Sequence, residues 1–225
     1  MSPICLPTLH LRVHEFVWLQ RYQRVILALV TLLFSVWIMT APTIGHAILA
    51  ALACGGGAFC SWYLYRRSQV GYTLTATHFQ QHLFKGGWAM QWKNIQRLGQ
   101  CHYRDREGWS HPVPWIGFKL VDYEPFIDAI CPRVASEMLI NQRGLLYLAL
   151  RGNLDPRIED KLFDTARYTS KSGRQFRGLQ AMLAQRMRYQ RECYGYDIFI
   201  STADLDRDID SFIGLLRRYK AGAIT

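Results

Sequence analysis

The longest stretch without charge runs from Val25 to Tyr65, where the sequence has no Asp, Glu, Lys or Arg. It is about twice the roughly 20 apolar residues that a helix needs to cross a bilayer. Pro42 and Gly45 interrupt it near its middle, as residues of a turn do. A soluble helix of this length would normally carry a polar face. The sequence therefore predicts a transmembrane hairpin, with spans at residues 25–41 and 47–64, rather than one buried hairpin of a soluble core.

Basic residues flank this run on both sides, and its central turn carries none. Because Lys and Arg stay on the cytoplasmic side of a membrane, we expect both termini to be cytoplasmic and the turn to face outward. A cleaved signal peptide is the rival interpretation, but a second apolar span follows at once and the first run is too long for an ordinary signal. The flanking residues are Arg12, Arg21, Arg24, Arg66 and Arg67.

Residues 69–225 are numerous enough for one domain with its own core, and residues 1–24 are expected to be a separate cytoplasmic segment. The formal net charge of +10 favours an anionic partner, and the nearest is the cytoplasmic leaflet. Nucleic acid is not expected, because aromatic residues do not interleave with the basic ones as in a stacking platform. The six cysteines form no CxxC pair, which favours free thiols in a reducing compartment.

The domain begins with β-rich runs and continues with helical spacing. A glycine after Lys85 supplies the positive φ of a hairpin turn, and residues 122–191 are predicted to be a helical insertion. Within it, the apolar run 144–150 fits either a strand or a buried helix, and a short helix at 156–167 precedes a polar linker. The predicted strands are residues 71–76, 78–84, 88–92, 94–104 and 113–121.

The last third of the domain has two predicted helices. Residues 175–192 form an amphipathic helix, and a strand at 196–201 follows. Ser201 to Asp204 fits the capping pattern [ST]-x-x-[DE], which predicts that the final helix starts there. The apolar face of the first of these helices consists of Phe176, Leu179, Met182, Leu183 and Met187.

Two segments, "YTLTATHFQQHLFKGGWAMQWKNIQRL" (72–98) and "YDIFISTADLDRDIDSFIGLLRRY" (196–219), resemble the bacterial PH-like domains. The resemblance implies a small bent β-barrel capped by one C-terminal helix and, in membrane-anchored members, preceded by a helical hairpin. Residues 122–191 depart from that pattern. The layout also resembles two-pass bacterial inner-membrane proteins of an uncharacterised family. The implied role is a binding or scaffolding module, and the resemblance names no ligand.

Three patterns were considered for chemistry, and none of them predicts a site. The alternating acids from Asp204 to Asp210 lack the Gly and Glu of a calcium loop, since those positions are Ile209 and Leu215. Cys101 and His102 are neighbours in a strand and point to opposite faces, so they do not form a metal or nucleophile pair with His111. Motifs of hydrolases, zinc proteases and nucleotide-binding loops do not occur. We therefore expect no enzyme, no metal and no cofactor.

A basic run from Arg167 to Arg191 contains no acid. A basic amphipathic helix can lie on an anionic membrane surface, so five arginines are candidate contacts for anionic headgroups. An ordinary solvated face and docking of a protein or nucleic acid are the alternatives. The overall prediction is a non-enzymatic, membrane-anchored module for lipid-surface or protein binding. A pure protein scaffold, a homo-oligomer and, last, a membrane-bound enzyme stay open. The five residues are Arg174, Arg177, Arg186, Arg188 and Arg191.

Overall fold

The computed structural model describes residues 6–12, 25, 30–32, 35–37, 39–40, 43–104, 107–152 and 158–224. The chain is a mixed α+β protein, as the sequence predicts. It divides into two compact units: Met1–Arg12 with Gly71–Thr225, and Val13–Val70. We describe each unit by itself.

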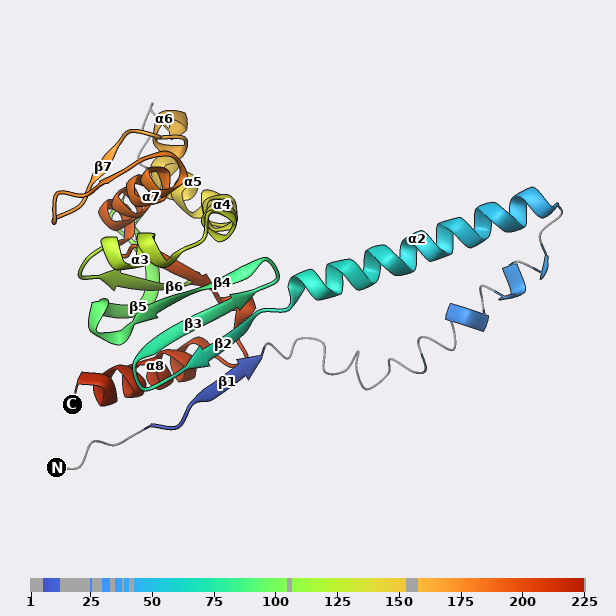
Figure 1. Cartoon of the computed structure of the whole chain (residues 1–225), viewed down its shortest axis with the longest axis horizontal. Coiled ribbons are helices and arrows are strands. Elements are labelled where there is room, and N and C mark those ends of the chain that lie inside the picture. Colours follow the sequence, from blue (N-terminus) through green and yellow to red (C-terminus); the bar gives the residue numbers. More distant parts are fainter. Residues whose placement is uncertain are drawn as a thin grey trace. The chain divides into compact units, whose positions relative to one another are not determined.

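The first unit contains a four-stranded antiparallel sheet in the order β1-β2-β3-β4 (Figure 1). Its strands are β1 (Leu9–Arg12), β2 (Gly71–Leu74), β3 (His78–Leu83) and β4 (Gly86–Gln91). The last three were predicted, and Gly86 has the positive φ, 136°, that the turn requires. The residues of β1 were predicted to lie in a segment separate from the domain. Its pairing with β2 adds it to the domain.

A second, three-stranded antiparallel sheet has the order β5-β6-β9. It consists of β5 (Ile95–Arg104), β6 (Ser110–Leu120) and β9 (Ile198–Ser201). A short 3-10 helix, η1 (Trp92–Asn94), connects it to the first sheet. Phe79 of β3 stacks on Phe118 of β6 with ring centroids 5.5 Å apart. The apolar sides of the two sheets thus form one core.

The C-terminal helix α8 (Ile209–Ile224) covers the first sheet (Figure 1). Phe212 meets the ring of Tyr72 at 5.3 Å, edge to face. The predicted start of this helix at Ser201 is wrong by several residues. Ser201 instead caps a single 3-10 turn by accepting from Ala203 N at 3.3 Å. Asp208 accepts from Ser211 N at 2.9 Å at the true start of α8, because a side-chain cap stabilises whichever backbone turn lies beside it.

The helical insertion lies between β6 and β9. The run 144–150, which fitted a strand or a helix, is helical. Residues 168–176, predicted in part as a linker, form a small hairpin. Phe126 packs on Trp88 of β4 at 5.7 Å, which attaches the insertion to the first sheet. Its elements are α3 (Glu124–Ala129), α4 (Pro132–Asn141), α5 (Arg143–Gly152), α6 (Ile158–Leu162), β7 (Tyr168–Thr169), β8 (Gln175–Phe176) and α7 (Gly178–Tyr194).

The second unit contains α2 (Ile44–Ser68). It begins three residues before the predicted span 47–64, because Thr43 caps it by accepting from His46 N at 3.4 Å. Eight of the 17 residues of the other predicted span, 25–41, lie outside the described residues. Of the rest, Val25, residues 30–32 and 35–37, and Met39 are helical, and Thr40 is in a turn.

Candidate functional site

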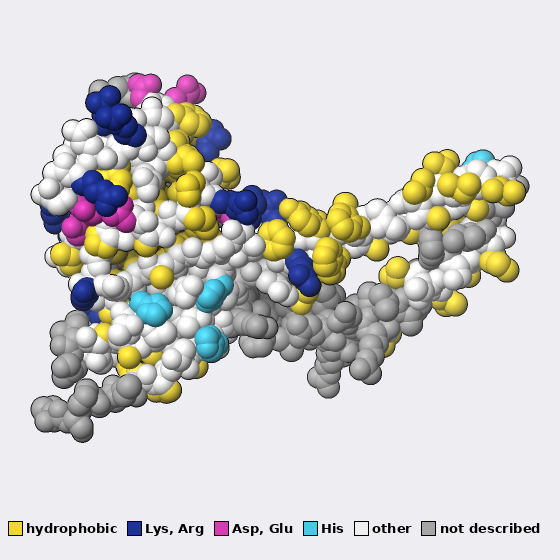
Figure 2. Space-filling model, in the orientation of Figure 1, with side chains coloured by type: hydrophobic (Ala, Val, Ile, Leu, Met, Phe, Trp, Pro, Cys, Tyr) yellow, Lys and Arg dark blue, Asp and Glu magenta, His cyan; other side chains and the backbone are white. Residues whose placement is uncertain are grey.

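Among the described residues, α2 is the one helix long and apolar enough to cross a membrane, over Ile44–Arg67. Figure 2 shows hydrophobic side chains along its surface. Large side chains such as Leu49, Leu52 and Phe59 are exposed, and nearly all the other described residues of α2 are exposed with them. Water would solvate such a surface poorly, whereas the hydrocarbon layer of a bilayer matches it.

The last two turns of α2 carry aromatic and basic side chains in place of the aliphatic ones that precede them. The guanidinium of Arg66 lies 4.9 Å from the centroid of the Trp62 ring. Arg67 follows it and is also exposed. Tryptophan and basic residues are the side chains that prefer the boundary between hydrocarbon and headgroups. This end of α2 therefore has the composition of an interface.

The strand pairing fixes where the chain leaves the domain and where it returns. Arg12, the last residue of β1, pairs with Gly71, the first residue of β2. The whole of Val13–Val70 is inserted between these two paired residues. The two residues that flank this segment are therefore neighbours in one sheet.

The structure places the five predicted arginines in different environments. Arg186 is in the interior, with 3% of its surface exposed. Its Nη2 donates to the carbonyl of Leu162 at 2.7 Å, and its Nη1 to that of Leu139 at 3.5 Å. Burial, with a contribution from nearby Arg143, lowers the pKa of Arg186 to about 10. Arg186 is thus a structural residue that is not available to a headgroup.

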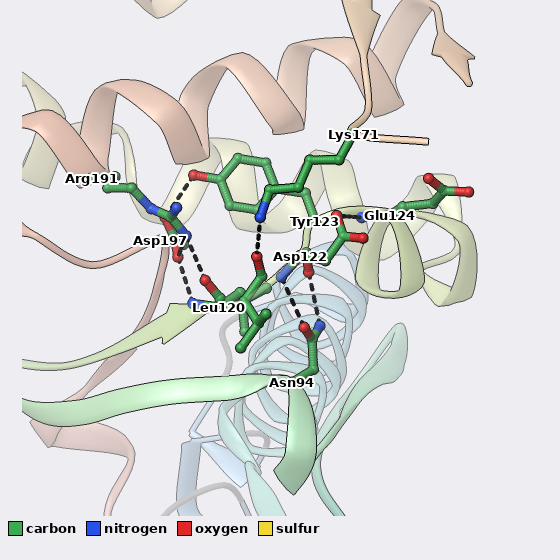
Figure 3. A network of polar contacts seen from close by, with 9 residues as sticks. Asn94, Leu120, Asp122, Tyr123, Glu124, Lys171, Arg191 and Asp197 are labelled. Atoms are coloured by element: carbon green, nitrogen blue, oxygen red, sulfur yellow. Dashed lines mark hydrogen bonds and ion pairs between the residues drawn. The ribbon is translucent and has the colours of Figure 1, made fainter. Parts of the chain in front are cut away.

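Arg191 belongs to a buried polar cluster (Figure 3). It forms an ion pair with Asp197, whose exposure is 0%, and its Nη2 donates to the carbonyl of Leu120 at 2.8 Å. The Asp197 carboxylate also accepts from Leu120 N at 2.6 Å and from the Tyr123 hydroxyl at 2.7 Å. Hydrogen bonding to Asp197 raises the pKa of Arg191. The cluster joins β6, α7 and β9 with the start of α3, which is a structural role.

The remaining three arginines lie on the surface. Arg174 pairs with Asp128 and lies 5.3 Å from the Phe176 ring centroid. Arg188 donates to the Tyr189 hydroxyl at 3.2 Å, and Arg177 is exposed. The face of α7 also differs from the prediction, because Gln185 and Gln190 are buried while Leu179 is exposed. The insertion packs around α7 on more than one side, so a single apolar stripe does not describe it.

The residues of the Cys/His pattern lie in different environments. Cys101 is buried, and burial raises the pKa of its thiol to about 12. His102 is exposed, with Nδ1 3.2 Å from the carbonyl oxygen of Gln100. His111 lies beside Tyr103 in the β5–β6 register. Within the described part of the chain, no three His, Cys, Asp or Glu side chains lie close enough together to hold a metal ion.

A polar chain that the sequence did not predict crosses the first three strands. The Thr73 hydroxyl lies 3.0 Å from His10 Nδ1 and 2.8 Å from His82 Nε2. Burial, and secondarily His10, lowers the pKa of His82. The alternation of Leu9 and Leu11 with His10 is the signal that could have revealed β1 and this contact.

A family model described as "Protein of unknown function (DUF2982)" matches residues 72–222, more than half of the chain. The chain belongs to this family. No curated protein and no solved structure matches it.

The DUF2982 match begins within β2 and ends within α8. It therefore includes the insertion, the Asp197 cluster and both sheets except β1 and the first residue of β2. It includes neither β1 nor α2. β1 nevertheless belongs to the same domain as the matched region, because it completes the first sheet.

Proposed function

We propose that this DUF2982 chain is a non-enzymatic module held in a bacterial inner membrane by two spans, residues 25–41 and α2. Its two-sheet domain lies on the cytoplasmic side, with both termini, and serves as a binding platform. Two antiparallel sheets, β1-β2-β3-β4 and β5-β6-β9, followed by the C-terminal helix α8, support a PH-like design for this domain. The insertion between β6 and β9 is the part that departs from that design.

The observation that carries this proposal is the pairing of Arg12 with Gly71. A chain that leaves a domain and returns to the same place crosses a membrane an even number of times. If α2 crosses once, a second crossing must come from the residues before Thr43. The charge-free run 25–41 is the segment of suitable length and composition. The fold of the domain thus favours two spans over one.

Protein binding is the second candidate for the platform, and one observation favours it. Four large hydrophobic side chains are exposed on α4, on α5 and directly after α6, and Arg143 lies 5.8 Å from the Phe163 ring centroid. Clustered exposed apolar side chains are typical of protein interaction sites. The four are Ile140, Tyr147, Leu148 and Phe163.

Topology can be tested by cysteine labelling in a bacterial host. Cys131 is exposed on the domain and serves as its native reporter. The other cysteines are replaced, and Thr40→Cys marks the turn while leaving the Thr43 cap intact. We expect a membrane-impermeant maleimide to label position 40 in cells with an opened outer membrane. Cys131 should react only after the inner membrane is permeabilised.

Labelling of both positions from the same side would contradict the two-span anchor. A variant with Cys131 alone is the matched control for leakage of the inner membrane. Extraction of the full chain by carbonate, without detergent, would contradict integral insertion altogether.

A further inference from the structure

The register of the first sheet places one turn at the same end as both connections to Val13–Val70. Gly71 pairs with Arg12 on one side and with His82 on the other, and His82 pairs with Gly87. One row of residues therefore crosses all four strands. The β3–β4 turn, Phe84-Lys85, lies just beyond this row.

The connection from α2 to this end of the sheet is two residues long, Gln69 and Val70. Ser68 is the last residue of α2 and Gly71 the first of β2. Three Cα–Cα steps of 3.8 Å span at most about 11 Å. Neighbouring strands lie about 4.8 Å apart, so Gly87, two strands away, is about 10 Å from Gly71. The turn begins two residues after His82, which places it about 6–7 Å beyond the row. These bounds depend on covalent geometry alone.

The side chains at this turn suit a membrane surface. Phe84 is 44% exposed, and Lys85 beside it is exposed. A Cβ on Gly86 would lie 3.2 Å from Val134 Cγ2, so the start of α4 lies against the turn. Arg133, the neighbour of Val134, is exposed, whereas Glu137 one turn later is half-buried. An aromatic ring beside basic side chains is the combination that binds the interface of an anionic bilayer.

We propose that this end of the first sheet rests on the bilayer that holds α2, with Phe84 in the interface and Lys85 and Arg133 facing anionic phospholipid headgroups. The inference rests on the membrane anchor proposed above and assigns the lipid contact to the β3–β4 turn. It replaces α7, whose Arg186 is buried and whose Arg191 is paired with Asp197. The turn thereby fixes which surfaces of the domain face the cytoplasm.

The test uses the full chain, freed of its native cysteines, in phosphatidylcholine vesicles with and without phosphatidylglycerol. A nitroxide is attached at Phe84→Cys, and collision rates with oxygen and with a water-soluble nickel chelate are compared. Thr77→Cys is the matched control, because it is an exposed turn position at the opposite end of the same sheet. If the Phe84 variant does not fold, Lys85→Cys takes its place.

We expect the oxygen-to-nickel ratio to be several-fold higher at position 84 than at position 77, and higher with phosphatidylglycerol than without. Equal ratios at the two positions would overturn the contact, as would a label at Arg188→Cys that lies in the headgroups while position 84 lies in water. If the label at position 84 lies at the same depth with and without phosphatidylglycerol, Lys85 and Arg133 do not bind anionic headgroups. Labelling at position 40 separates the two proposals. If position 40 is labelled from outside while the label at position 84 lies in water, the membrane anchor stands and the lipid contact of the β3–β4 turn is wrong.

Discussion

Arg186 and Arg188 lie two positions apart on α7 and have opposite environments. The first is buried between the carbonyls of Leu139 and Leu162, and the second is exposed beside Tyr189. Arg186→Glu should lower the free energy of unfolding by about 3–5 kcal/mol, because it leaves an uncompensated charge in the interior. Arg188→Glu should change it by about 0.5 kcal/mol or less. Chemical denaturation of the full chain in detergent, followed by near-ultraviolet circular dichroism, measures both.

The pair of variants has a consequence for experiments on membrane binding. A charge reversal that includes Arg186 would weaken binding by unfolding the insertion, whatever surface touches lipid. Equal stability of the two variants would contradict the buried position of Arg186. Arg177→Glu is a further surface control, since Arg177 is exposed and precedes α7.

At the scale of elements, Asp197 is one of the residues that attach the insertion to the second sheet. Asp197→Ala should destabilise the domain by about 3–5 kcal/mol, because Arg191 and Leu120 N lose their buried acceptor. Asp128→Ala is the matched control. It breaks the exposed pair with Arg174 and should cost about 1 kcal/mol or less. Thermal denaturation of the two variants side by side gives the comparison.

Hydrogen exchange would show which elements respond to the loss of Asp197. We expect faster exchange in α3, α7 and β9, with little change in the first sheet, which does not contact the carboxylate. Similar melting temperatures for the two variants would contradict the role of the cluster as a joint between elements.

At the scale of the whole molecule, the pairing of Arg12 with Gly71 predicts that the domain can be separated from its anchor. Replacing Val13–Val70 with the two-residue turn Asn-Gly should give a folded monomer, because a two-residue turn closes an antiparallel pair. Residues 71–225 alone should be less stable and should associate, since β2 becomes an unpaired edge and the buried side chain of Leu11 is lost. Light scattering and thermal melting compare the two proteins.

The hydroxyl of Tyr219 in α8 adds to this expectation, because it donates to the carbonyl of Pro7 at 2.7 Å. The residues before the anchor thus contact the far end of the chain. If residues 71–225 alone match the linked protein in stability and remain monomeric, β1 does not contribute to the stability of the domain. An even number of membrane crossings then no longer follows from the pairing of β1.

The sequence by itself determined the features that depend on neighbouring residues. The absence of charge from Val25 to Tyr65 predicted the apolar helix, and turn chemistry at Gly86 predicted the β3–β4 hairpin. Tertiary structure decided what depends on distant partners. β1 is only four residues long and is recognised through its pairing with β2, across the whole anchor segment. The arginines of α7 look alike in the sequence, but the elements packed around the helix determine which of them water can reach, and therefore which can bind a partner.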